Sequence, residues 1–425
     1  MAKSFLTILA AGLFTLPLSA EEHSPELARK TFLAVWQKVD ESFYDRTFNG
    51  VDWKKIKEQY EGKVKEAGSR EELRTILNEM LGELGRSHFG VFGSGEENDD
   101  QNENGAYLGL ELRFSKGKLL VFEVAPDSPA AKAGVTPGME IVKIEKKGVP
   151  KFLKSHSIKP DSKGVVLHHA MGEVYELAAT PKDGKTTLRI KGRKKPFNFR
   201  PGFYEGEWGS LGQGQEHPVE FNTSLVPGEE KVRLIDFNIF VPSIMPRLIK
   251  AVAQANSENA DGMIIDLRGN PGGLAIMATG LIGRLIDEEL DLGDMNNPSG
   301  NYPFHAFPQE NAYLGPIAVL VDSFSASTSE IFAAALQEHK RARIIGRPTM
   351  AAVLPSILDN LPNGDRLQYA IGDFVTAVDK VHLEGQGVTP DDLIPLDPAV
   401  LQQGKDPDLE AALRWIKKQK TKKKQ

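Results

Sequence analysis

A run of serines follows a short apolar strand pattern in the C-terminal half of the chain. Residues 316–321 (PIAVLV) lead into DSFSASTSE (322–330), where an Ala- and Leu-rich helical pattern begins. A serine at a sharp strand-to-helix turn is held outward, and the unpaired N–H groups and dipole of the helix start suit a developing oxyanion. The pattern therefore indicates a nucleophilic serine. Ser327 and Glu330 also satisfy S-x-x-E, so capping of the helix by Ser327 is an equally good interpretation.

A glycine-rich turn follows a second strand pattern of the buried type. Residues 263–267 (MIIDL) run into RGNPGG (268–273). Such a turn can present a bare backbone N–H to a developing negative charge. We expect Asp266 and Arg268 to orient this turn rather than to react.

The composition restricts the chemistry further. The 425 residues contain no cysteine, which excludes disulfides, thiolate metal sites and a cysteine nucleophile, so any nucleophile is an oxygen or an amine. The pair His168-His169 lacks a metal-site pattern, and we expect neither metal nor cofactor. A net charge of −6 gives no global drive towards nucleic acid.

The N-terminal twenty residues have the layout of a secretory signal peptide. Lys3 precedes an uncharged apolar run over 5–18, and small residues stand at 19–20. We therefore expect an exported protein, periplasmic or extracellular, without a stable membrane span after cleavage. The alternative is an N-terminal anchor helix, for which the run is short.

The rest of the chain divides by pattern into four regions and a linker. Residues 21–92 show helical apolar spacing, 93–104 form an acidic linker, and 105–197 contain short strands. Residues 198–405 alternate apolar strands with helices, which indicates an α/β layered domain with parallel pairing. Residues 406–425 are predicted to be a basic C-terminal tail, with a frayed helix end as one interpretation.

Region 105–197 resembles a PDZ domain. Strand patterns flank the segment APDSPAAKAGVTPG (125–138), which predicts a short helix closed by Gly134. Tyr107-Leu108-Gly109-Leu110 matches the loop whose amides receive a peptide carboxylate in that family. Consecutive N–H groups and a glycine beside a strand edge suit this role. The alternative is a β-rich domain without a ligand.

Three segments resemble the carboxy-terminal processing (tail-specific) serine proteases and their tricorn-like relatives. They are GMIIDLRGNPGG (262–273), AVLVDSFSASTSEIFAAALQEHKRARIIGRPT (318–349) and LEGQGVTPD (383–391). The resemblance implies an α/β fold, with a crotonase-like (ββα-spiral) protease core, an N-terminal helical segment and an inserted PDZ domain. It also implies Ser327 as nucleophile, with the amides of Gly273 and Thr328 as oxyanion donors.

One position departs from the lysine-dyad branch of this family. Ala352 stands where that branch has its general-base lysine, and an alanine cannot take a proton. The tricorn-like branch uses Ser, His and Glu, which match Ser327, His88 in LGRSH (84–88) and Glu384. The implied roles are base for His88 and orientation of its ring for Glu384. The alternatives are that His88 is a hydrogen-bonded turn residue and Glu384 a surface acid.

The resemblance implies an exported serine endopeptidase that cleaves proteins near their C-termini, with the PDZ domain holding the free peptide end. The alternative is a catalytically inactive PDZ scaffold, because the dyad lysine is missing at Ala352. A third interpretation is an engineered replacement of that lysine. His382 is a reserve candidate for the base, since strand alternation would place it on the same face as Glu384. The hairpin turn 361–365 is a candidate for the cleft wall. The oligomeric state stays open.

Overall fold

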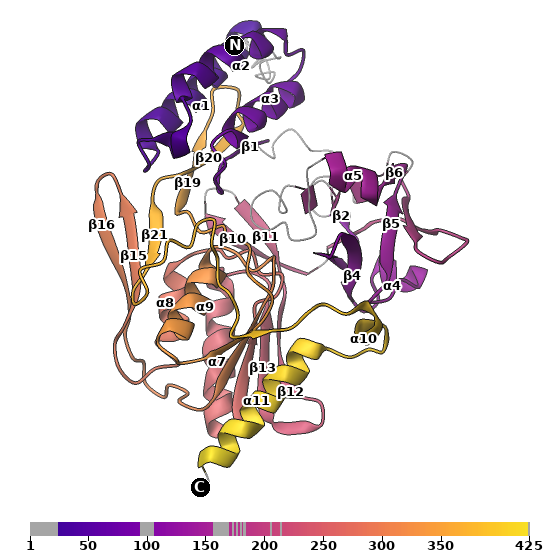
Figure 1. The fold of residues 1–425 in the computed structure, drawn as a ribbon, viewed down its shortest axis with the longest axis vertical. Coiled ribbons are helices and arrows are strands. Elements are labelled where there is room, and N and C mark those ends of the chain that lie inside the picture. The colour runs from indigo at the N-terminus through magenta and orange to yellow at the C-terminus, as the bar shows by residue number, and fades with distance from the viewer. Residues whose placement is uncertain are drawn as a thin grey trace, which may run out of the picture.

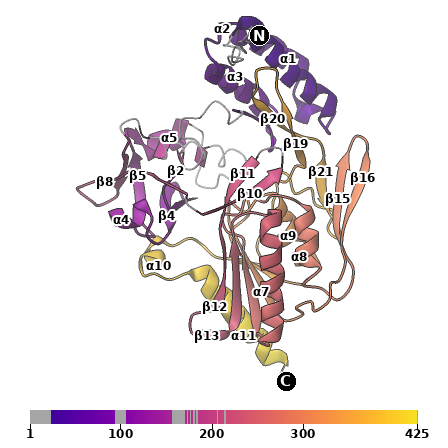
Figure 2. The ribbon, with the colours of Figure 1, turned by 180° about the vertical axis from the view of Figure 1, so that it is seen from behind.

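The computed structural model describes residues 24–93, 106–155, 184–204, 206–212 and 215–423, with seven residues between 170 and 181. The predicted signal peptide, residues 1–20, and the acidic linker apart from residue 93 lie outside the described residues. Figures 1 and 2 show a helical segment at one end, a β-rich region at the side and a larger α/β body. Within the described residues, no helix is long and apolar enough to cross a membrane.

The N-terminal segment packs three helices against a β-hairpin of the α/β body. Side-chain oxygens of Ser24, Asp52 and Ser69 accept the first free N–H groups and so begin the three helices. The elements are α1 (Pro25–Ser42), η1 (Phe48–Gly50), α2 (Trp53–Glu66), α3 (Arg70–Gly82), β1 (Gly90–Phe92), β19 (Ser356–Asn360) and β20 (Arg366–Ala370). Strand β1 pairs with β20, and the helices share one apolar core with the β19–β20 hairpin. This pairing fixes the turn between α3 and β1 relative to the α/β body.

The β-rich region has a sheet and an apolar core of its own. Its strands run in the order β3-β4-β5-β7-β8, in agreement with the short strands predicted for this region. The elements are β2 (Ala106–Tyr107), β3 (Leu110–Ser115), β4 (Lys118–Val124), α4 (Pro129–Ala133), β5 (Glu140–Ile144), β6 (Lys147–Gly148), α5 (Val149–Ser155), β7 (Thr186–Ile190), β8 (Phe197–Phe199) and β9 (Gly202–Phe203). Helix α4 ends at Gly134 in the left-handed conformation, as predicted.

The α/β body is built on a six-stranded sheet in the order β12-β13-β14-β17-β18-β22. From β13 to β22 all pairings are parallel, which confirms the predicted α/β layering. The elements are β12 (Phe221–Val226), β13 (Glu229–Phe237), η2 (Pro242–Ile244), α7 (Met245–Ser257), β14 (Gly262–Asp266), α8 (Ile276–Ile282), β17 (Ile317–Val321), α9 (Thr328–Glu338), β18 (Arg343–Gly346) and β22 (Asp392–Leu393). Helices α7, α8 and α9 cover one face of the sheet, where Ile265 and Val319 point.

Smaller elements surround the central sheet. The hairpin β15–β16 pairs with β21 and projects from the body, whereas β10 and β11 form a separate two-stranded sheet (Figure 1). Their bounds are β10 (Glu207–Gly212), β11 (Gln215–Val219), β15 (Leu290–Asn297), β16 (Gly300–Ala306), β21 (Asp373–Thr376) and α10 (Pro398–Gln402).

The prediction of a basic C-terminal tail for residues 406–425 is wrong for most of that range. Residues 407–423 form helix α11 (Pro407–Lys423), which crosses the second face of the central sheet (Figure 1). Its buried residues Ala412 and Ile416 pack against Ile264 and Leu320. The lysine-rich composition hid the few apolar residues at helical spacing that fix this helix on the sheet.

Candidate active site

Ser327 stands between the end of β17 and the start of α9, in a strained backbone conformation. Its φ of 53° and ψ of −117° are rare for a non-glycine residue and occur where the surrounding structure enforces them. The Ser327 N–H donates to the carbonyl of Ala352 at 2.9 Å and to the Glu330 carboxylate at 3.0 Å. Ser327 is the N-cap residue of α9, and its backbone N–H is held by a carbonyl on one side and by the Glu330 carboxylate on the other.

The glycine-rich turn packs directly against Ser327. A Cβ on Gly272 would lie 2.8 Å from both the Ser327 Cβ and the Thr328 nitrogen, so only glycine fits. The Phe240 N–H donates to Gly272 O, and the Phe240 carbonyl accepts from Leu274 N–H. In this parallel bridge the Gly273 N–H is directed to the other side. Neither the Gly273 nor the Thr328 N–H donates to another described residue.

His88 and Glu384 are connected through a third residue, Ser87. The Ser87 hydroxyl lies 2.7 Å from His88 Nδ1 and donates to Glu384 Oε2 at 2.8 Å. A hydroxyl carries one hydrogen, so with that hydrogen on the carboxylate it accepts from a protonated Nδ1. The basic lone pair of the neutral imidazole then lies on Nε2. Ser87 thus sets the tautomer of His88, a role that we had expected Glu384 to fill directly.

Glu384 is held in place by backbone donors as well. Its carboxylate accepts from the N–H groups of Ser87 at 2.8 Å and Val353 at 2.9 Å, and its exposed fraction is 9%. Burial raises the pKa of Glu384, while these hydrogen bonds oppose the rise. The alternative of a surface acid is therefore wrong, because Glu384 is buried and fully engaged.

One cavity of about 780 Å³ joins these parts. Ser87, His88, Gly273, Ser327 and Thr328 all line it, so the fold brings together residues from the N-terminal segment and the α/β body. Most of the other lining side chains are apolar: Phe89, Phe92, Leu211, Ile239, Leu274, Met295, Ile331, Met350, Val353, Leu354, Ile357, Leu358, Ile371 and Phe374.

Ala352 also lines this cavity, beside the nucleophile candidate. No lysine of the described residues contributes to the lining, and the basic side chains present are His88 and His217. His217 lies on β11, its Nε2 is buried without a hydrogen-bond partner among the described residues, and burial lowers its pKa. His217 could not be predicted as a site residue, because a single histidine in a weak strand pattern carries no signal. Ser87 was detectable as the serine immediately before His88.

Two other candidates lie outside the cavity. His382 does not share a face with Glu384: its side chain is largely exposed and pairs with Asp373. The hairpin turn 361–365 joins β19 to β20 as predicted, yet it contacts α3 through Asp365 and Arg70 and does not line the cavity.

The predicted carboxylate loop lines a second cavity of about 540 Å³. Tyr107, Leu108, Gly109 and Leu110 contribute to it. His217, Ile239 and Pro271 line both cavities, so the two adjoin. The β10–β11 hairpin, which carries His217, stands between the loop and Ser327.

Comparison with known proteins finds related peptidases. Residues 231–394 match peptidase family S41, and residues 25–82 match the tricorn protease C1 domain. The chain is 27% identical to a carboxyl-terminal-processing protease of Synechocystis sp., over 86% of this chain and 81% of that relative. It is 26% identical to a chloroplastic C-terminal processing peptidase of Tetradesmus obliquus, over 91% and 80% respectively.

Solved structures show the same fold. The photosystem II D1 C-terminal processing protease aligns with a TM-score of 0.58 and 23% identity, over 91% of this chain and 96% of that one. Mature CPAF aligns with a TM-score of 0.64 and 16% identity, over 93% and 96%. The strained serine, the cavity and the matches to both sequence families lead to one conclusion: residues 231–394 are a peptidase family S41 domain, and the chain is a serine peptidase similar to carboxyl-terminal-processing proteases.

Proposed function

We propose that the protein is an exported endopeptidase that cleaves proteins near their C-termini, with Ser327 as nucleophile and His88 as general base. The observation that carries the proposal is that Ser327, in its strained turn, lines one cavity with the His88 imidazole, whose Nδ1 is tied through Ser87 to buried Glu384. The names of the relatives support a carboxyl-terminal-processing activity.

The proposed reaction uses these groups in two steps. Ser327 Oγ attacks the peptide carbonyl carbon and its proton passes to His88 Nε2. The negative charge on the carbonyl oxygen is stabilised by the N–H groups of Gly273 and Thr328. The C–N bond then breaks as His88 returns the proton to the leaving amine, and water hydrolyses the acyl-enzyme by the same route.

Glu384 stabilises the imidazolium that forms between these steps. Its negative charge acts on His88 through the Ser87 hydroxyl, which keeps Nδ1 protonated throughout. Because Ser87 N–H and Val353 N–H also bond the carboxylate, Glu384 stays in place while the histidine charge changes.

We further propose that region 105–197 is a PDZ domain inserted in a crotonase-like ββα-spiral protein and that it binds the free carboxylate of the substrate. Support comes from the loop 107–110, which lines a cavity next to that of Ser327. A peptide whose end is bound at this loop would extend past His217 into the catalytic cavity. Export rests on the signal-peptide pattern of residues 1–20.

Labelling with a fluorophosphonate reagent tests the catalytic proposal. We expect the wild type to be labelled, Ser327→Ala to be unlabelled and His88→Ala to be labelled far more slowly. His382→Ala is the matched control, because His382 lies outside the cavity and is largely exposed. Equal labelling of His88→Ala and wild type would refute the histidine base.

The competing function is an inactive scaffold, which the alanine beside Ser327 favours. An unlabelled wild type would support it. Ala352→Lys adds a second readout: a large gain in cleavage of an unstructured polypeptide would indicate that the chain descends from a Ser–Lys enzyme and works poorly without that lysine.

A further inference from the structure

Asp322 connects the two loops that surround the proposed oxyanion hole. It directly follows β17, is fully buried, and its Oδ1 accepts from the N–H of Gly269 at 3.0 Å and of Phe324 at 3.0 Å. Gly269 belongs to the turn that carries Gly273, and Phe324 to the loop that carries Ser327. A single carboxylate oxygen therefore fixes the spacing between these loops.

The two loops are joined again closer to Ser327. The carbonyl of Asn270 accepts from the Ala326 N–H at 3.0 Å and from the Ser329 hydroxyl at 3.0 Å. The Thr328 hydroxyl donates to Gly273 O at 2.7 Å. Because these bonds are short and local, a shift of the Asp322 carboxylate would be passed to the N–H groups of Gly273 and Thr328.

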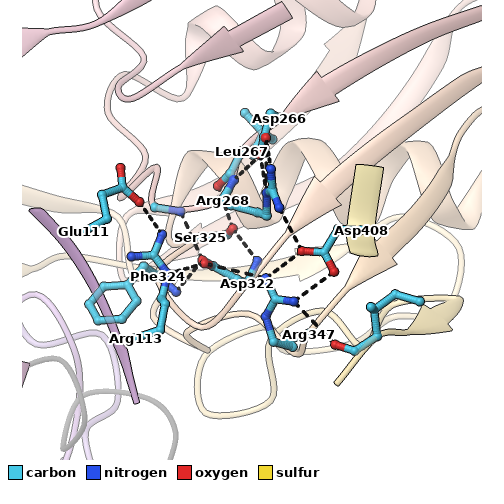
Figure 3. Close-up of polar contacts among 12 residues, drawn as sticks. Glu111, Arg113, Asp266, Leu267, Arg268, Asp322, Phe324, Ser325, Arg347 and Asp408 are labelled. Atoms are coloured by element: carbon cyan, nitrogen blue, oxygen red, sulfur yellow. Dashed lines mark hydrogen bonds and ion pairs between the residues drawn. The ribbon is translucent and has the colours of Figure 1, made fainter. Parts of the chain in front are cut away.

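The second oxygen of Asp322 is held by a residue of the β-rich region. Arg113, on β3, directs its Nε to Asp322 Oδ2, and its Nη2 bonds Glu111 at 2.8 Å (Figure 3). The Arg113 guanidinium is also stacked between the rings of Phe122 and Phe324, 4.7 and 4.8 Å from their centroids. Only 3% of Arg113 is exposed, so this contact between the β-rich region and the α/β body is buried.

The electrostatics of Asp322 depend on this contact. Burial would raise the pKa of the Asp322 carboxyl, but the Arg113 and Arg347 guanidinium groups outweigh it and lower the pKa to about 2. Arg347 is the more distant of the two, at 4.0 Å, and shares its charge with Asp408 at 2.8 Å (Figure 3). Arg113 is thus the main cation that keeps Asp322 charged and in place.

We propose that Arg113 is a positioning residue for catalysis: from the β-rich region it fixes Asp322, and through Asp322 the loops that carry the Gly273 and Thr328 N–H groups. The proposal rests on the proposed oxyanion role of those two groups. The catalytic site is then complete only while β3 is docked on the α/β body.

The test measures how fast a fluorophosphonate reacts with Ser327 in the full chain, separating the maximal rate from the half-saturating concentration. For Arg113→Met we expect the maximal rate to fall about 10- to 100-fold, which is less than the loss caused by removing an oxyanion donor outright. The half-saturating concentration should not change. Arg113→Lys, which keeps the charge without the fixed fork, should lie between Met and wild type.

Two further variants separate positioning from general destabilisation. Arg233→Met removes another buried arginine, which lies on β13 outside both cavities and pairs with Glu258 at the end of α7; this variant should leave the rate unchanged. Asp322→Asn should slow the reaction as Arg113→Met does, and the double variant should be no slower than the slower single variant.

The outcomes are distinct. A reactive wild type with equally reactive Arg113→Met would overturn this inference alone, and additive losses in the double variant would do the same. If Arg113→Met fails to fold, an unchanged rate in Arg113→Lys overturns it. An unreactive wild type would overturn the proposed function together with this inference.

Discussion

Replacing Ser87 with alanine tests the hydrogen-bonded path from Glu384 to His88. The variant leaves the carboxylate bonded to the N–H groups of Ser87 and Val353, so Glu384 keeps its position. It removes the only hydroxyl that lies between that carboxylate and His88 Nδ1 among the described residues. The imidazolium formed during the reaction would then lose its charge-assisted partner, and the tautomer of the neutral ring would no longer be set.

The size of the effect follows from the kind of bond that is lost. A hydrogen bond that involves a charged group contributes about 1.5–3 kcal/mol. Since about 1.4 kcal/mol corresponds to a tenfold change in rate, we expect kcat to fall about 10- to 150-fold. KM should change little, because the bond strengthens as the imidazolium forms and contributes least to binding of the ground state.

The assay is steady-state cleavage of an internally quenched peptide, with fluorophosphonate labelling of Ser327 as a second readout. Ser87→Thr keeps a hydroxyl and should recover most of the activity. A kcat for Ser87→Ala equal to that of the wild type, with Ser327→Ala inactive in the same assay, would show that Glu384 does not act on His88 through Ser87.

Three further predictions concern the loops and the fold. Gly272→Ala should abolish labelling of Ser327, since its Cβ would lie 2.8 Å from the Ser327 Cβ. The control Gly62→Ala, where the added Cβ meets nothing within 4 Å, should be labelled normally. Retained labelling of Gly272→Ala would contradict the close approach. The pKa of Asp322 is lowered from 3.8 to about 2, so its charge contributes about 2 kcal/mol of stability above pH 4 that is lost as the pH falls through 2. Urea unfolding at pH 6 and pH 3 should show about half of this loss, about 1 kcal/mol, in the wild type and not in Asp322→Asn; identical pH dependence would disprove it. Ile416→Ala should lower the free energy of unfolding by about 2–5 kcal/mol, because Ile416 is buried against the sheet; a change below about 0.5 kcal/mol would mean that α11 is not part of the core.

Much of the fold could be predicted from local patterns. The buried strands 263–267 and 317–321 are continuous apolar runs, and the turns after them contain glycine or serine, so their secondary structure and the position of Ser327 at a strand–helix turn depend on neighbouring residues alone. The amphipathic spacing of the N-terminal helices was readable for the same reason. The charged C-terminal helix could not be predicted, because its few apolar residues form a buried stripe only when a sheet face lies opposite them.

The catalytic arrangement needed the tertiary structure. Ser87 and Glu384 are 297 positions apart, and Arg113 and Asp322 are 209 apart, so no local pattern records their contact. The sequence by itself determined which residue types are present: a serine at a turn, a histidine, a glutamate, and an alanine where a lysine would stand. Only the folded chain decided that Ser87 lies between His88 and Glu384, that His382 faces away, and that His217 and Arg113 approach the site, because distance and burial arise when separate elements pack together.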